Sequence, residues 1–173
     1  MMQKLEASRD DVRIAALAVL AITLHVMEGA FPSPLPGIKP GISNIITVVV
    51  LCQAGWEWAV WITILRVLVG SVVLGTFLSP TFVLSLSGAC GALIALGVGS
   101  VFSRRIPILK LGPLGYSVLA SGAHIGAQFL VAYMLFIPHI GLLKLIPLFG
   151  GAALVFGALN GMISVKVVQY LNK

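Results

Sequence analysis

One segment of the chain, residues 81–102, runs for 22 positions without a charged side chain. About 20 apolar residues in a helix are enough to cross the hydrocarbon core of a bilayer. The rest of the chain has the same character, because 59% of its residues are hydrophobic and only 9% are charged, against about 25% charged in soluble domains. The sequence therefore predicts an all-α, polytopic membrane protein.

Six apolar segments are expected to cross or enter the membrane. They cover residues 12–30, 42–54, 58–78, 81–102, 115–137 and 145–168. The second has only 13 residues, which as a helix would span roughly 20 Å of a core about 30 Å thick. We therefore expect a short cytosolic lead-in over residues 1–11 and a single domain of six transmembrane helices over residues 12–173, the second helix being short.

The positive charges follow the pattern that orients membrane proteins. A cytosolic N-terminus puts eight cations on the inner side and leaves two, Lys39 and Lys144, outside. The eight inner cations are Lys4, Arg9, Arg13, Arg104, Arg105, Lys110, Lys166 and Lys173. This bias predicts a multi-pass protein of the cytoplasmic (inner) membrane with both termini cytoplasmic. Because the cations lie at segment ends instead of forming one patch, no nucleic-acid partner is expected.

A secretory signal peptide is an alternative interpretation of the N-terminus, since cations precede an apolar run there. The acids Glu6, Asp10 and Asp11 neutralise this region. We therefore favour a first membrane-spanning helix.

The strongest interruption of the apolar pattern lies between residues 28 and 44. It contains four prolines and three glycines, so it cannot be a continuous helix. We expect residues 29–43 to form a loop that caps a cavity, with prolines that lower the entropic cost of ordering it over a ligand. The residues expected to shape this lid are Pro32, Pro34, Pro36, Gly37 and Gly41.

Glu28 and Arg66 are the two charges placed deepest in the membrane. A lone charge there costs at least about 2.5 kcal/mol, so each should face the interior of the bundle and find a partner. Two interpretations stay open. The residues form a structural ion pair between the first and third helices, or they belong to a ligand- or proton-linked site.

Other polar side chains are candidates for the same cavity. His25 lies three residues before the acid, and His124 and Gln128 lie four apart, which puts them on one helix face. Lys39 and Asn44 flank the start of the short second segment, where exposed backbone N–H groups suit an anionic or strongly polar ligand. The alternatives are a packing histidine, interhelical hydrogen bonds and a solvated loop lysine.

The sequence lacks the motifs of common catalytic sites. It has no HExxH spacing, no aspartate-rich cluster and no Walker A sequence. Cys52 and Cys90 lie in different apolar segments and are expected to be buried. We therefore expect no catalytic residue, no metal and no cofactor, and infer that the chain is not an enzyme.

The interrupted stretch resembles the signature of the Gx transporter family. The matching positions are Glu28, Pro32, Pro34, Pro36, Gly37, Lys39, Gly41 and Asn44, helped by Arg66, Gly70 and Gly75. Members of this family are often labelled heptaprenyl diphosphate synthase component I and are similar to the S components of energy-coupling factor (ECF) transporters. The resemblance implies an S-component-like six-helix bundle with an outward-facing pocket under the loop after the first helix.

That resemblance also implies a function. S components bind a vitamin-like solute and pair with a transmembrane coupling subunit and two ATPases. The alanines of the first segment, Ala15, Ala16, Ala18 and Ala21, depart from the strict AxxxA pattern that many S components use for docking. We expect the substrate-binding subunit of an importer for a polar or anionic solute, embedded in the lipid bilayer.

A second function stays open beside import. The only adjacent acids are Asp10 and Asp11, so the chain cannot form the aspartate-rich active site of a prenyl diphosphate synthase. It would instead be a non-catalytic membrane subunit associated with heptaprenyl diphosphate or isoprenoid quinone synthesis. A lateral opening between helices without a polar floor would favour this alternative.

Overall fold

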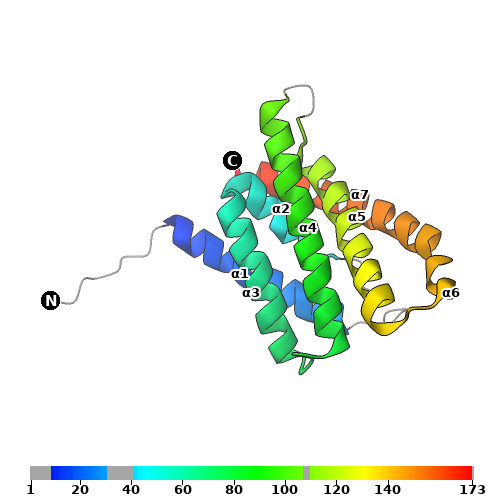
Figure 1. Cartoon of the computed structure of the whole chain (residues 1–173). Helices are drawn as coiled ribbons and strands as arrows, with labels where there is room; N and C mark the ends of the chain where they lie inside the picture. Colours follow the sequence, from blue (N-terminus) through cyan, green and yellow to red (C-terminus); the bar gives the residue numbers. More distant parts are fainter. Residues whose placement is uncertain (1–8, 31–40, 107–109, 173) are drawn as a thin grey trace.

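The computed structural model describes residues 9–30, 41–106 and 110–172, and all of its regular elements are helical (Figure 1). The elements are α1 (Arg9–Ala30), α2 (Asn44–Gln53), α3 (Trp56–Val73), α4 (Pro80–Arg105), α5 (Pro113–Val131), a π-helical turn (Ala132–Phe136), α6 (Ile140–Leu143) and α7 (Ile146–Leu171). Five helical segments of the described chain are long and apolar enough to cross a membrane, and α2 is a shorter apolar helix. The predicted all-α polytopic membrane bundle is confirmed.

The short helix α2 lies at the centre of this bundle. Every residue from Asn44 to Leu51 is buried, and α2 packs against α1, α3, α5 and α7. A helix that is apolar on all sides is expected to be enclosed by other elements. At 10 residues it extends about 15 Å, roughly half the depth of the hydrocarbon core.

The long helices form two groups around α2. In Figure 1, α3, α4 and α5 lie side by side, and α4 packs against both neighbours. Behind them α1 crosses against α3 and α7 crosses against α5. The C-terminal ends of α4 and α7 lie toward the top of this view, and the α3–α4 turn lies at the bottom.

Small residues bring α5 close to its neighbours. A Cβ on Gly91 of α4 would lie 2.5 Å from Ala127 Cβ and 2.7 Å from the Ala123 carbonyl oxygen on α5. On α7, a Cβ on Gly157 would lie 3.0 Å from Val118 Cα. Such close backbone approach is how helices associate in lipid, where no hydrophobic effect drives them together.

The third helix is shorter than predicted. The sequence predicts a helix to residue 78, but α3 ends at Val73, because Gly75 adopts a left-handed conformation with φ +66°. The Gly75 N–H donates to the Val72 carbonyl, and the Thr76 N–H donates to the Ser71 carbonyl at 2.8 Å. This pair of bonds is a Schellman motif, which closes a helix at a glycine.

The expected burial of the cysteines is wrong. Cys52 at the end of α2 and Cys90 on α4 are both exposed at the surface of the chain. In α4, the buried positions Gly88, Ala89 and Ala92 leave Cys90 on a different side of the helix, because successive residues are rotated by about 100°.

Candidate functional site

The carboxylate of Glu28 binds the start of helix α2. Glu28 lies in the last turn of α1 and is buried. It accepts hydrogen bonds from the backbone N–H groups of Gly41, Ile42 and Ser43, and from the Ser43 hydroxyl at 3.1 Å. N–H groups at a helix start have no partner within the helix and favour an anion, so the protein's own acid occupies the anion site of α2.

Gly41 allows the turn into α2. Its φ is +73°, and a Cβ there would lie 2.7 Å from Asn44 Nδ2, so glycine is the residue that fits. The Gly41 carbonyl accepts a hydrogen bond from Asn160 Nδ2 on α7 at 3.3 Å. The turn is therefore held from one side by Glu28 on α1 and from another by Asn160.

Arg66 of α3 approaches the same turn from within the bundle. It is only 1% exposed; its Nη1 donates to the Ser43 hydroxyl, and its Nη2 donates to Asn44 Oδ1 at 2.6 Å. The Ser43 hydroxyl thus connects Arg66 to the carboxylate of Glu28. A guanidinium and a helix N-terminus both stabilise a buried carboxylate, so the two deep charges support each other through Ser43.

A small cavity lies beside these groups. Its volume is about 10 Å³, which corresponds to about one water molecule. The lining side chains are His25, Glu28, Ser43, Arg66, Val67, Ser85, His124 and Gln128. The cavity therefore gathers polar groups from α1, the start of α2, α3, α4 and α5.

Five of the predicted site residues line this cavity together. They are His25, Glu28, Arg66, His124 and Gln128. Asn44 joins them through its bond to Arg66. Lys39 and the lid residues Pro32, Pro34, Pro36 and Gly37 lie outside the described residues.

Gln128 gives the cluster unused hydrogen-bonding capacity. It is fully buried, and within the described chain neither its amide nitrogen nor its amide oxygen has a hydrogen-bond partner. The same holds, within the described chain, for Arg66 Nε and Asn44 Nδ2. A buried polar group left without a partner costs about 1–3 kcal/mol, and folded proteins contain few of them. Such a concentration is typical of a site that receives a polar species.

The backbone of α4 makes room for the two α5 side chains. A Cβ on Gly88 would lie 2.7 Å from His124 Cε1 and 2.8 Å from Gln128 Cγ. Gly88 therefore lets both side chains reach the cavity between α4 and α5.

Ser43, Ser85 and Asn160 contribute to the site but are not among the residues predicted from the sequence. Asn160 carried a signal, because it is an amide in the middle of an apolar segment, where polar groups usually form interhelical bonds. Ser43 directly precedes the predicted residue Asn44. Ser85 belongs to a segment with several serines, and its sequence does not distinguish it from Ser87.

A separate apolar groove lies between α5 and α7. Its volume is about 410 Å³. Gly122, Gly126 and Phe129 line it from α5, and Gly150 and Ala153 line it from α7. Among its lining residues, only Tyr133 has a polar side chain. This groove has no polar floor, in contrast to the cavity beside Glu28.

The chain matches the family described as heptaprenyl diphosphate synthase component I over residues 17–167. It belongs to this family. No curated protein and no solved structure matches the chain. The family label expected from the stretch around Glu28 is thus confirmed, and the likeness to S components stays a prediction. Both the polar cluster and the apolar groove lie within the matched region.

Proposed function

We propose that this multi-pass membrane protein is the solute-binding subunit of an importer and carries out no catalysis. The observation that carries the proposal is the buried polar cluster around Gln128, whose amide lacks partners among the described residues. A purely structural bundle would bury apolar side chains at these positions at lower cost.

The chemistry of the cluster favours a polar solute that both donates and accepts hydrogen bonds. The Gln128 amide offers one donor group and one acceptor group. Arg66 is the Lys or Arg side chain among the described residues that line the cavity, so an anionic group of the solute would lie beside its guanidinium. The N–H groups of α2 are already bound to Glu28, so they would bind a solute only after Glu28 moves.

The size of the cavity supports a closed form. Small-molecule pockets usually have volumes of about 300–1,000 Å³, much larger than the 10 Å³ found here. The contacts of Glu28 with residues 41–43 are those that would open to admit a solute. We therefore keep the loop predicted over residues 29–43 as the proposed lid, except that residues 29 and 30 belong to α1.

Import also needs an energy source. The sequence contains no Walker A motif, so ATP would be hydrolysed by another protein. A transmembrane coupling subunit with ATPases in the cytoplasmic membrane is the partner that this proposal requires.

The variant Gln128→Leu tests solute binding. Leucine removes two unsatisfied polar atoms, so the variant should unfold at the same temperature as the parent chain or a higher one. It should nevertheless lose the small molecules that co-purify with the parent chain, as measured by mass spectrometry. The control is Gln53→Leu, since Gln53 is exposed and bonds to Asn172 far from the cluster. Equal retention by both variants would contradict the proposal.

A second candidate function is a non-catalytic subunit of heptaprenyl diphosphate synthesis. The apolar groove between α5 and α7 favours it, because an isoprenoid chain is an apolar ligand and the groove lacks a polar floor. The printed family name points in the same direction.

The variant Gly126→Leu tests this second function. Gly126 lines the groove, and a Cβ there meets no atom within 4 Å, so a leucine side chain would extend from this position into the groove. It should reduce labelling by a photoreactive prenyl diphosphate. Gly151→Leu is the control, because Gly151 is also open on α7 but does not line the groove. Equal labelling of both variants would exclude prenyl binding in the groove.

A further inference from the structure

The hydrogen bonds of Glu28 define the chemical group that the start of α2 can bind. Its Oε1 accepts the backbone N–H groups of Gly41 and Ile42, and its Oε2 accepts the N–H and the hydroxyl of Ser43, at 3.4 and 3.1 Å. The left-handed conformation of Gly41 lets successive N–H groups converge on one anion. Two acceptor oxygens are thus held by the donors of residues 41–43, which is the pattern of a carboxylate site.

The charge of this site is balanced while one anion occupies it. Arg66 is buried and donates to the Ser43 hydroxyl, which in turn donates to Glu28. Removing the anion alone would leave a buried guanidinium and the N–H groups of the helix start uncompensated, which is costly. Glu28 can therefore leave this site at low cost when another group of the same charge takes its place.

Polar atoms beside the site have hydrogen-bonding capacity to spare. The amide nitrogen and oxygen of Gln128 and the Nε of Arg66 are buried and have no hydrogen-bond partner in the part of the chain that the structure describes. Gln128, Arg66 and Glu28 line the same cavity of about 10 Å³, so these atoms surround one small space. A ligand whose carboxylate replaced that of Glu28 would place its neighbouring atoms beside the Gln128 amide.

We propose that the solute of this protein carries a carboxylate and binds in exchange for the carboxylate of Glu28. This inference rests on the solute binding proposed above and names the class of the solute. The solute carboxylate would accept the N–H groups of residues 41–43 and lie beside Arg66, while a hydroxyl or amide group of the solute would bond to Gln128. Glu28, in the last turn of α1, would leave the site as the lid opens.

A carboxylate fits this exchange better than a phosphate or a neutral group. It has the two oxygens and the single charge of the Glu28 side chain, so it can use the same donors. A phosphate group carries close to two charges and three acceptor oxygens, more than the site now balances. A neutral solute would leave the charge of Arg66 uncompensated once Glu28 had moved.

Acetate binding to the variant Glu28→Ala tests the carboxylate site. Alanine removes the native carboxylate, so added acetate should bind at residues 41–43. At about five times its dissociation constant, acetate should raise the unfolding temperature of the purified full chain by about 2–4 °C. Acetamide, sodium chloride and sodium phosphate should each give a smaller shift at the same pH. The absence of a saturable acetate effect, or an equal effect of acetamide or phosphate, would overturn the proposal.

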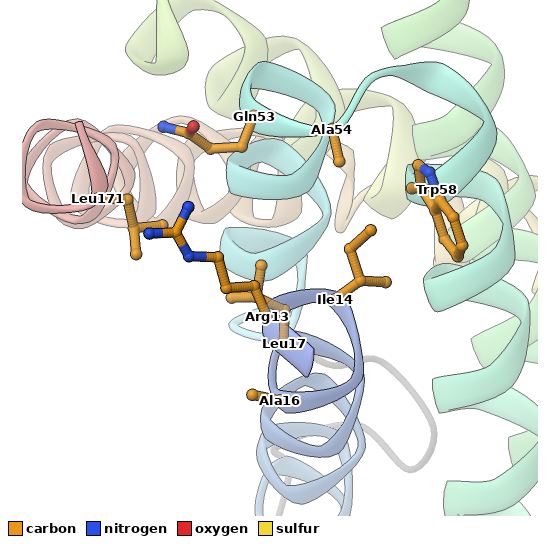
Figure 2. A pocket seen from close by; sticks show the side chains of 8 residues that line it. All are labelled: Arg13, Ile14, Ala16, Leu17, Gln53, Ala54, Trp58 and Leu171. Carbon is orange, nitrogen blue, oxygen red and sulfur yellow. The ribbon is translucent and has the colours of Figure 1, made fainter. Parts of the chain in front are cut away.

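Two comparisons separate this site from other places where acetate could bind. Glu57→Ala also removes an acid beside a helix start, but Glu57 is exposed on α3, so acetate should stabilise it no more than the parent chain. A pocket of about 440 Å³ lies where α1 begins, at the far end of that helix from Glu28, and includes Arg13 and Trp58 (Figure 2). Acetate bound there would shift the parent chain and both variants alike. An equal shift in all three would therefore overturn the proposal.

Retention of co-purifying solutes tests the exchange without an added probe. Because Glu28 competes with the solute carboxylate, folded Glu28→Gln should retain up to about tenfold more solute than the parent chain, since a neutral acceptor bonds more weakly than a charged one by about that factor. The retained molecules, identified by mass spectrometry, should carry a carboxylate. Loss of these molecules from folded Glu28→Gln, or retained molecules without a carboxylate, would overturn the exchange.

The variant Gln128→Leu distinguishes this outcome from a failure of the proposed function. If Gln128→Leu retains the same molecules as Gln53→Leu, solute binding in the polar cluster is wrong, and the exchange is wrong with it. If Gln128→Leu and Glu28→Gln both lose molecules that Gln53→Leu retains, the cluster binds a solute, but Glu28 contacts that solute directly instead of competing with it. That second result would overturn the exchange alone.

Discussion

The buried charges of this chain are stabilised by hydrogen bonds to the residues at the start of α2 as well as by each other. Glu28 accepts hydrogen bonds from three backbone N–H groups at the start of α2. Arg66 donates hydrogen bonds to the Ser43 hydroxyl and to the Asn44 side chain. An isolated charge in the hydrocarbon core would be costly, but here each has several hydrogen-bonding partners. The two sequence-based interpretations, a structural pair and part of a site, are therefore compatible in one arrangement.

A double-mutant cycle between Glu28 and Arg66 tests this arrangement. Arg66→Met alone removes a partner from buried polar groups and should cost about 3–5 kcal/mol of unfolding free energy. Glu28→Gln should also destabilise, since it weakens the bonds to residues 41–43. We expect the double mutant to be less destabilised than the sum of the single mutants by at least about 1 kcal/mol, measured by denaturant unfolding in one detergent.

The control cycle pairs Arg66→Met with Glu57→Gln. Glu57 is an exposed acid in the first turn of α3, so its effect should simply add to that of Arg66→Met. Additive effects in the Glu28 cycle as well would show that Ser43 does not couple the two charges.

At the scale of elements, glycines decide how closely the helices pack. They line α4 and α7 where these helices meet α5, so α5 contacts both neighbours through short distances between backbones. The polar cluster depends on this packing, because His124 and Gln128 of α5 reach the cavity over Gly88 of α4.

The variant Gly91→Ala should separate α4 from α5. Its new Cβ would lie 2.7 Å from the Ala123 carbonyl oxygen, and backbone cannot move aside as a flexible side chain can. We expect a loss of about 1–3 kcal/mol of stability, typical of overpacking, read as a lower thermal unfolding temperature. Gly126→Ala on α5 meets no atom within 4 Å and should be neutral or slightly stabilising through its helix propensity. A neutral Gly91→Ala would contradict the close contact.

At the scale of the whole molecule, we expect the half-length helix α2, added to the five helices long enough to cross a membrane, to give an even number of passes. α1 runs away from the N-terminal end of the bundle, and α2 returns to that end before α3 begins. This topology places Lys144 at one end of the bundle. At the other end it places the described cations Arg13, Arg104, Arg105, Lys110 and Lys166. We therefore expect both termini to face the cytoplasm.

Cysteine labelling of intact cells tests this topology. In a chain whose Cys52 and Cys90 are replaced by alanine, a membrane-impermeant maleimide should label His139→Cys from outside. It should reach Arg13→Cys, Arg105→Cys and Asn172→Cys only after the cells are opened; these three positions and His139 are exposed. Labelling of Arg13→Cys and Asn172→Cys from opposite sides would contradict an even number of passes.

The sequence alone determined the class of protein, the apolar segments and the residues worth inspecting. These can be read from the sequence because hydrocarbon excludes charges and unpaired backbone groups. Glu28, Arg66 and the proline- and glycine-rich stretch therefore stand out whichever way the helices pack. The end of α3 was also encoded, at Gly75, although the hydropathy pattern alone placed it too late.

Only the tertiary structure decided how these residues combine. It supplied the bonds of Glu28 to α2, the bridge through Ser43, the contact of Asn160 with Gly41 and the pocket at Arg13. Each joins segments far apart in the chain. Such contacts depend on how each helix is rotated and shifted against its neighbours, which side-chain packing and interhelical hydrogen bonds set and apolar periodicity does not.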